Sequence, residues 1–123
     1  MVDLIFFSLN QVTLMEKVCS VSDVPEGTMR GFTVKLRYLL LVNLGGKFYA
    51  MDAVCPHMGG YLPIGKFENG IVTCPVHGSQ YDVKTGKLVK DVPGFLKILT
   101  GGGSRDLNSY NVEVEDGSVF VKF

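Results

Sequence analysis

The residues best suited to chemistry lie in two short runs, each with a histidine close behind a cysteine. Cys55-Pro56-His57 is followed, after sixteen intervening residues, by Cys74-Pro75-Val76-His77. The two runs contain both histidines of the chain and two of its three cysteines. A short turn in each run would let sulfur and nitrogen point the same way, so two such turns side by side would make a four-ligand metal site.

These ligand types leave the metal open. Thiolates suit zinc or an iron–sulfur cluster, and neutral imidazole suits zinc, iron or copper. A Cys₂His₂ zinc finger usually takes both cysteines from one turn and both histidines from one helix. Each run here mixes the two types, which disfavours a zinc finger, although a zinc-stabilised binding module stays an alternative.

Two longer runs around these ligands resemble the halves of the Rieske motif, C-x-H-x-G and C-x-x-H-G. They are Cys55-Pro56-His57-Met58-Gly59-Gly60 and Cys74-Pro75-Val76-His77-Gly78-Ser79-Gln80-Tyr81-Asp82. The resemblance covers about residues 15 to 123 and is weaker around Leu96–Asn108. Because both halves are intact, it is specific, and the chain resembles the soluble Rieske-type ferredoxins of oxygenase systems.

That resemblance implies one [2Fe–2S] cluster, with Cys55 and Cys74 on an inner iron and His57 and His77 on an outer iron near the surface. Replacing two thiolates by neutral imidazoles raises the reduction potential to roughly −150 to +300 mV, against about −400 mV for plant-type centres with four cysteines. Electrons are then expected to enter and leave at the histidine edge.

The Rieske proteins of quinol-oxidising complexes are similar but join the two loops by a disulfide. Gly60 and Val76 occupy those cysteine positions here, so that bridge is impossible. Gly59, Gly60 and Gly78 are expected instead to let the loops approach the sulfides with bare backbone N–H groups.

Ser79 and Tyr81 match the high-potential branch of the family. The resemblance implies that the serine hydroxyl bonds a bridging sulfide and the tyrosine hydroxyl bonds the sulfur of Cys55, so both residues belong to the cofactor-binding set. Because donors to sulfur stabilise the more negative reduced cluster, we expect a potential above that of a Rieske ferredoxin lacking both hydroxyls.

Other residues near the motif allow more than one interpretation. Val92-Pro93-Gly94 is either a loop closing over the cluster or an ordinary turn. An apolar rim for brief docking could come from four residues, although core packing is the commoner fate of such side chains: Met58, Tyr61, Leu62 and Phe95. Cys19 is expected to be a buried apolar residue rather than a third redox group.

The elements that must position these residues are predicted to be mostly β. Alternating or β-branched runs are separated by Gly, Pro, Asn and Asp, and capped helical stretches of ten or more residues are hard to find. Gly101-Gly102-Gly103-Ser104 is expected to be a plain flexible loop. Predicted strands are Glu16–Ser20, Gly31–Lys35, Tyr38–Asn43, Lys47–Asp52, Gly70–Cys74, Gln80–Asp82, Lys87–Lys90, Tyr110–Glu115 and Val119–Phe123.

Glycine-containing turns separate these strands. Leu44-Gly45-Gly46, Glu68-Asn69-Gly70, Thr85-Gly86 and Asp116-Gly117 place glycine where a positive φ costs little, three of them as hairpin signals. We therefore expect an all-β Rieske fold of antiparallel sheets.

The 123 residues are expected to form one domain. Within it, a small cluster-binding subdomain at about residues 53–92 would be inserted in a basal β domain. Residues 1–14 would be an N-terminal extension, interpreted as a strand packed on the sheet or against another subunit.

Composition limits the partners. Twelve basic residues balance twelve acidic ones without a Lys/Arg stripe, which argues against nucleic acid and anionic membrane. Leu4-Ile5-Phe6-Phe7 is short, follows Asp3 and lacks a cleavage site, so it is not expected to be a signal peptide. Three cysteines without an export signal disfavour a disulfide framework. These features favour a soluble, cytoplasmic protein.

The resemblance implies an electron carrier rather than an enzyme, because no histidine remains for a second catalytic constellation. Its expected partners are an NAD(P)H-dependent flavoprotein ferredoxin reductase and a terminal oxygenase or other redox enzyme. The alternative is a Rieske-like small subunit of a larger oxidoreductase such as nitrite reductase.

Overall fold

A seven-stranded antiparallel sheet forms the base of the molecule in the computed structural model, which describes residues 2–8 and 11–123. The strand order is β1-β2-β11-β10-β5-β4-β3. In chain order these strands are β1 Val2–Ser8, β2 Gln11–Ser20, β3 Thr28–Val34, β4 Arg37–Leu44, β5 Lys47–Asp52, β10 Ser109–Glu115 and β11 Ser118–Lys122. A 3₁₀ turn, η1 (Val21–Asp23), follows β2.

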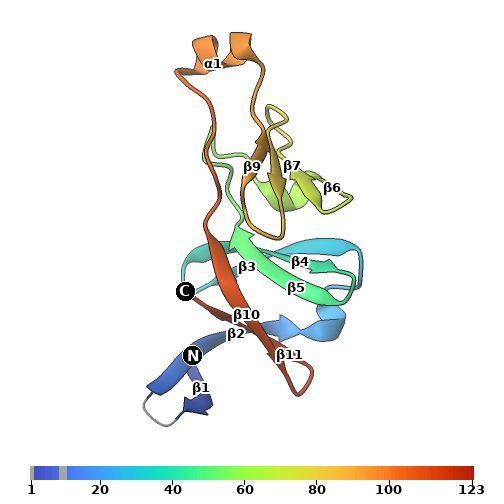
Figure 1. Cartoon of the computed structure of the whole chain (residues 1–123), viewed down its shortest axis with the longest axis vertical. Coiled ribbons are helices and arrows are strands. Elements are labelled where there is room, and N and C mark those ends of the chain that lie inside the picture. Colours follow the sequence, from blue (N-terminus) through green and yellow to red (C-terminus); the bar gives the residue numbers. More distant parts are fainter. Residues whose placement is uncertain (1, 9–10) are drawn as a thin grey trace.

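The chain between β5 and β10 builds a second, smaller sheet of order β6-β7-β8-β9. Its strands are β6 Lys66–Glu68, β7 Ile71–Thr73, β8 Gln80–Asp82 and β9 Leu88–Lys90. The 3₁₀ turn η2 (Leu62–Ile64) precedes it, and the helix α1 (Gly94–Thr100) follows it. The base, the second sheet and α1 follow one another along the long axis of the molecule, with α1 at the far end from the base (Figure 1).

The two ends of this inserted segment are bound together at a neck. The backbone N–H of Asp52 donates to the carbonyl of Asn108 at 3.0 Å, and the N–H of Asn108 donates to Asp52 Oδ2 at 3.2 Å. The Tyr110 hydroxyl donates to the same carboxylate. Beyond these contacts β10 pairs with β5 at only two positions, so the neck fixes where the inserted segment leaves the base.

Two apolar clusters fill the interior. One lies in the base and includes Leu39, Leu41 and Val119. The other lies under the second sheet and contains Cys55, Cys74 and Tyr81 beside purely apolar residues. The run Leu39–Val42 of β4 is buried throughout, because neighbouring strand residues face opposite sides of the sheet and both clusters take side chains from it.

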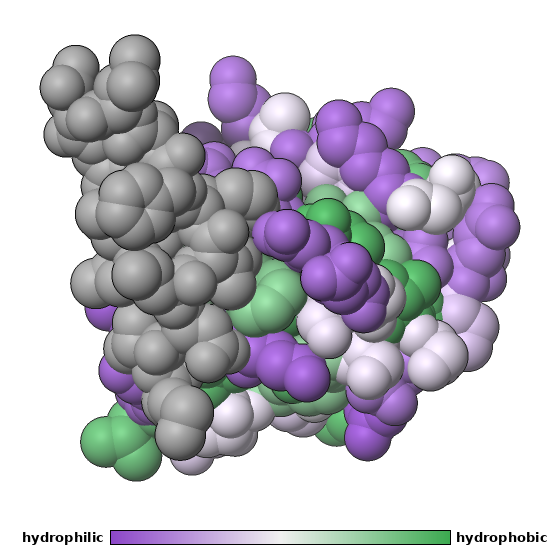
Figure 2. Space-filling model, turned by 90° about the horizontal axis from the view of Figure 1, so that it is seen from below, coloured by the Kyte–Doolittle hydropathy of each residue, from purple (hydrophilic) through white to green (hydrophobic). Residues whose placement is uncertain are grey.

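The surface at the end opposite α1 is mixed. Figure 2 views the molecule from that end and shows hydrophilic side chains around the periphery of the described surface, with apolar ones between them. In the described part of the chain, no helix is long and apolar enough to cross a membrane.

All nine predicted strands are present, with boundaries shifted by a few residues, and the all-β prediction is confirmed. Positive φ occurs in each predicted glycine turn: at Gly45 and Gly46, Asn69 and Gly70, Gly86, and Asp116 and Gly117. Sequence analysis missed β6 and the first half of β2. The strand expected in the N-terminal extension is β1, which pairs with β2; residues 1, 9 and 10 lie outside the described residues.

The prediction of a plain flexible loop at Gly101-Gly102-Gly103-Ser104 was wrong. Gly101 closes α1 in the left-handed region at φ 83°, and the N–H of Gly102 donates to the carbonyl of Lys97 at 2.8 Å. The N–H of Ser104 donates to Asp91 Oδ1 at 2.9 Å. This glycine run is therefore a structured return from the helix, in which glycine supplies backbone angles that other residues rarely adopt.

The stability of the base is expected to depend strongly on its apolar cluster. Leu41→Ala removes a fully buried side chain and is expected to lower the free energy of unfolding by roughly 2–5 kcal/mol, because it leaves a cavity. Leu36→Ala alters a side chain that is 95% exposed and should change it by less than about 0.5 kcal/mol. Urea unfolding followed by circular dichroism measures both; equal midpoints would contradict the assigned core.

Candidate metal centre

The two cysteine–histidine runs form loops with the same backbone turn. In the first loop, the N–H of Cys55 donates to the carbonyl of Gly60 at 2.8 Å, and the N–H of Gly59 donates to the carbonyl of Cys55 at 2.9 Å. The second loop repeats both bonds five and four residues beyond its cysteine, with Cys74 N to Ser79 O at 2.8 Å and Gly78 N to Cys74 O at 3.1 Å. The two turns therefore share their backbone bonds, although the histidine comes two residues after the cysteine in the first loop and three residues after it in the second.

The glycines of these loops have two different tasks. Gly59 and Gly78 adopt φ of 74° and 80°, the left-handed conformation that closes each turn. Gly60 is needed for space, because a Cβ there would lie 2.5 Å from the Cys74 sulfur and 2.8 Å from Val76. The same contact shows that positions 60 and 76 are neighbours across the loops. No disulfide joins any two of the three cysteines, Cys19, Cys55 and Cys74.

The four ligand candidates come together in the fold. Cys55 and Cys74 are buried at the inner side, and the two histidines are half-buried at the outer side. The Nδ1 atoms of His57 and His77 face each other at 3.3 Å, and their rings meet edge to face. Two thiols and two ring nitrogens therefore border one small region.

Hydroxyl groups surround the Cys55 sulfur. It lies 3.0 Å from the Tyr81 hydroxyl and 3.4 Å from the Ser79 hydroxyl, and these two oxygens lie 3.2 Å apart. Burial raises the pKa of the Cys55 thiol, but the bonds from Ser79, Tyr81 and the His57 backbone outweigh it, so the pKa lies below its usual value. The site thus stabilises negative charge on this sulfur.

Cys74 and Tyr81, which lie in the same apolar cluster as Cys55, have raised rather than lowered pKa values. Burial raises the pKa of the Cys74 thiol, and the backbone N–H groups of Val76 and His77 offset this only in part. Burial and the bond to Cys55 raise the pKa of Tyr81 to about 12. Tyr81 therefore keeps its proton near neutral pH and acts as a donor.

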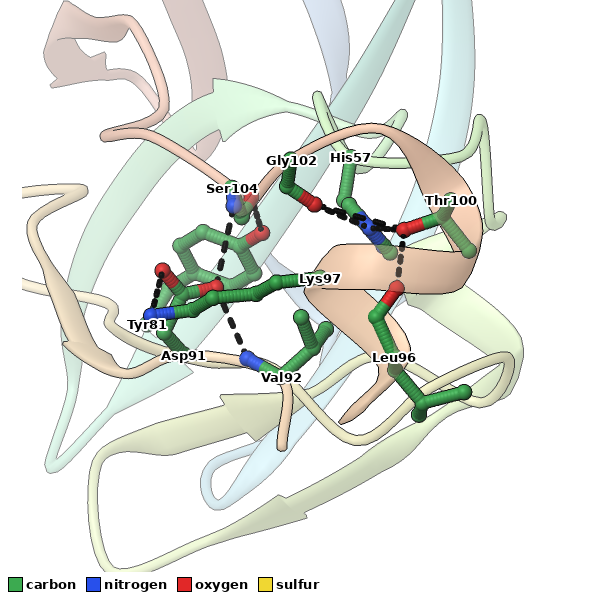
Figure 3. A network of polar contacts seen from close by, with 9 residues as sticks. All are labelled: His57, Tyr81, Asp91, Val92, Leu96, Lys97, Thr100, Gly102 and Ser104. Carbon is green, nitrogen blue, oxygen red and sulfur yellow. Dashed lines mark hydrogen bonds and ion pairs between the residues drawn. The ribbon is translucent and has the colours of Figure 1, made fainter. Parts of the chain in front are cut away.

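Sequence analysis missed a second set of polar residues, contributed by α1 and its return (Figure 3). His57 Nε2 lies 2.7 Å from the Thr100 hydroxyl and 3.0 Å from the Gly102 carbonyl. The Ser104 hydroxyl lies 2.5 Å from the Tyr81 hydroxyl. The one available signal was Val92-Pro93-Gly94, expected as a loop or a turn, where Pro93 instead caps the start of α1.

Asp91 binds both ends of the segment that contains α1 and its return, at Val92 and at Ser104. Its Oδ1 accepts the N–H of Val92 at 2.7 Å and of Ser104 at 2.9 Å, and its Oδ2 lies 3.5 Å from the Lys97 ammonium group. The bond from the Ser104 N–H, with those from Val92 and Lys97, holds the pKa of Asp91 below its usual value. Gly103 passes so close that a Cβ would lie 2.5 Å from Oδ2.

Of the residues expected to form an apolar rim, Met58, Tyr61 and Phe95 are exposed, whereas Leu62 is fully buried. Leu62 faces inward because it starts η2 and packs in the core with Cys55 and Cys74. Cys19 is buried as expected, and burial raises its pKa to about 11, which suits an apolar role.

The donor set fits a two-metal group. Within residues 2–8 and 11–123, no three or more His, Cys, Asp or Glu side chains converge on a point that would hold one metal ion. A pair of thiols and a pair of imidazoles on opposite sides suits a cluster with two ligands on each iron.

The comparison with known families decides which group this is. Residues 15–100 match the model of the Rieske [2Fe-2S] domain. This chain belongs to the Rieske [2Fe–2S] domain family. Its cofactor is one [2Fe–2S] cluster, and the sulfur and nitrogen donors described above fit that cluster.

Individual relatives differ in length. The chain is 34% identical over 105 residues to apoptosis-inducing factor 3 of Homo sapiens, covering 85% of this chain but only 16% of that protein. It is 32% identical over 114 residues to Ferredoxin CarAc of Metapseudomonas resinovorans, covering 92% of this chain and 95% of the relative.

Among solved structures, the fold is similar to a chain from the complex of reduced oxygenase and oxidized ferredoxin in carbazole 1,9a-dioxygenase. The TM-score is 0.72 at 30% identity, over 87% of this chain and 91% of that one.

The hydroxyls around Cys55 should raise the reduction potential. Ser79→Ala and Tyr81→Phe each remove a donor near its sulfur, and each is expected to lower the potential by an amount on the order of tens of millivolts, because the donors favour the reduced state. Tyr38→Phe, at a side chain of β4 in the base that is 59% exposed, is the control. Voltammetry on the three variants measures the shifts; unchanged potentials in the first two would contradict the expectation.

Proposed function

We propose that this chain is a cytoplasmic one-electron carrier of the ferredoxin type. It takes electrons from an NAD(P)H-dependent flavoprotein reductase and passes them to a terminal oxygenase or a similar redox enzyme. The [2Fe–2S] cluster, when bound, accepts and releases one electron at a time. The carrying observation is the placement of two buried thiols behind two half-exposed imidazoles that face each other at Nδ1.

Each ligand has a place in this proposal. Cys55 and Cys74 would hold one iron from the buried side, and His57 and His77, whose Nδ1 atoms face each other, would hold the other. Hydroxyl and N–H donors on the thiolate side stabilise negative charge there. The segment between β5 and β10, including residues 53–92, acts as the cluster-binding unit, and the neck at Asp52 and Asn108 holds it on the base.

The relatives support a carrier rather than an enzyme. One that matches over nearly its whole length is named a ferredoxin, and a solved relative is described in a complex of oxygenase and ferredoxin. Both histidines of the sequence belong to the proposed metal centre, which leaves neither for a separate catalytic group. The balanced charge gives no support for a nucleic-acid or membrane partner.

Anaerobic purification of the full chain tests the metal assignment. We expect two irons and two acid-labile sulfides per chain, and an EPR spectrum of the dithionite-reduced protein with a lower average g than a centre with four cysteine ligands. One zinc per chain in a colourless protein would instead identify a zinc-stabilised module and contradict the assignment.

A reconstituted electron-transfer chain tests the carrier role. In the presence of NADH, the reductase of a carbazole 1,9a-dioxygenase system should reduce the purified, monomeric chain. The terminal oxygenase of that system should then reoxidise it. Obligate copurification with a large redox subunit, without independent reduction, would favour the alternative of a Rieske-like small subunit as in nitrite reductase.

Partner docking should use the apolar residues of α1. Phe95, Ile98 and Leu99 are 64%, 84% and 76% exposed, and Thr100 of the same helix contacts His57. A redox partner that covered this helix would approach the histidine edge. Such an exposed apolar group on a short helix fits a brief encounter with another protein.

Phe95→Ser is therefore expected to raise the concentration of ferredoxin needed for half-maximal reduction of that oxygenase by about 5- to 30-fold, without changing the potential. Leu36→Ser, which changes an apolar residue in the turn between β3 and β4 that is even more exposed than Phe95, is the matched control. The same increase in both variants, or none in Phe95→Ser, would show that α1 is not the docking element.

A further inference from the structure

The two histidines of the centre differ in what lies behind them. His57 Nε2 is within hydrogen-bond distance of both Thr100 and Gly102. For His77, the side-chain hydrogen-bond contact found within residues 2–8 and 11–123 is that of Nδ1 with His57. Among the described residues, helix α1 and its return therefore place hydrogen-bond partners at Nε2 of His57.

The hydrogen atoms around Thr100 can be assigned from their partners. The Thr100 hydroxyl lies 2.6 Å from the carbonyl of Leu96, one turn back, which can only accept. That bond uses the single hydroxyl proton, so Thr100 accepts from His57. The Gly102 carbonyl also only accepts, so the proton of a neutral His57 lies on Nε2 and the lone pair lies on Nδ1. Nδ1 is the atom that faces His77.

The acceptors are held in place by the end of the helix. The N–H of Gly102 donates to the carbonyl of Lys97 at 2.8 Å, and Lys97 and Ser104 are both bound to Asp91. These bonds hold the return segment in place, so that the Thr100 hydroxyl and the Gly102 carbonyl stay in contact with the His57 ring.

We propose that Thr100 is a positioning residue for His57. The Thr100 hydroxyl accepts a hydrogen bond from the Nε2–H group of His57, keeps the ring oriented with Nδ1 toward the cluster and thereby lowers the reduction potential of the cluster. The inference rests on the proposed function, in which His57 is an iron ligand. An acceptor at the outer nitrogen raises the basicity of a metal-bound imidazole, and a more basic ligand favours the oxidised iron. The effect of Thr100 is thus opposite in sign to that of Ser79 and Tyr81.

The test compares the full-length holoprotein with three variants. Thr100→Val keeps the shape of the side chain but removes the acceptor, and Thr100→Ser restores a hydroxyl. Thr33→Val, at an exposed position of β3 in the base, is the matched control. Measurements are the iron and sulfide content, the EPR spectrum and the midpoint potential by voltammetry.

Thr100→Val is expected to raise the reduction potential. Because Gly102 remains as a second acceptor, the rise should correspond to at most about a tenfold change in the reduction equilibrium, which is 59 mV for one electron. Thr100→Ser should return the potential to that of the unmodified protein, and Thr33→Val should leave it unchanged. An unchanged or lowered potential in Thr100→Val with a full cluster, or no recovery in Thr100→Ser, overturns the inference.

Thr100→Ala covers the case in which Thr100→Val does not assemble a cluster, and its potential is measured in the same way. Loss of the cluster in Thr100→Val and Thr100→Ala but not in Thr100→Ser also supports the positioning role, whereas loss in all three Thr100 variants overturns it. Absence of a two-iron cluster in the unmodified protein contradicts the proposed function itself, so the two failures are distinguishable.

Discussion

Much of this structure offsets the cost of burying a sulfur that, as the proposed cluster ligand, would carry negative charge. Cys55 lies in an apolar cluster with Leu62 and Val72, where an unpaired thiolate would be strongly disfavoured. Two hydroxyl groups and a backbone N–H converge on that sulfur, and together they hold its pKa below the usual value despite burial. The loops, the second sheet and the return from α1 all contribute to placing those donors.

The donors reach the sulfur because three separate segments meet around it. The first loop supplies Cys55, β8 supplies Tyr81 and the chain beside it Ser79, and the return from α1 supplies Ser104, which contacts the Tyr81 hydroxyl. The neck between Asp52 and Asn108 gives the inserted segment a fixed origin, and Asp91 gives it a fixed far end. The same return places acceptors behind His57, so one segment contacts both the sulfur side and the nitrogen side of the centre.

Much of the fold was predictable, because its signals are local. Alternating apolar residues and glycine turns predicted nine strands, and the spacing of Cys55, His57, Cys74 and His77 predicted that these four residues meet. The second sheet's first strand, β6, has only three residues and gives little periodic signal. Leu62 looked like a rim residue, yet it is buried, because its environment depends on how η2 turns against the core.

The contacts of Thr100, Gly102 and Ser104 could not be predicted for a different reason. They join residues 23 to 45 positions apart in sequence, and their partners are determined by the angle at which α1 turns back rather than by any local pattern. A run of three glycines and a serine is typical of a flexible linker. Here Asp91 orders it, through bonds to the Ser104 N–H and to Lys97 of α1.

The assignment of both histidines as ligands is tested most directly by isotope labelling. Because the chain contains only two histidines, growth on ¹⁵N-histidine labels His57 and His77 alone. Electron–nuclear double resonance on the reduced protein should then show two strongly coupled ¹⁵N nuclei, each replacing a ¹⁴N signal of the unlabelled sample. A single strongly coupled nitrogen, or none, would contradict a cluster held by two cysteines and two histidines.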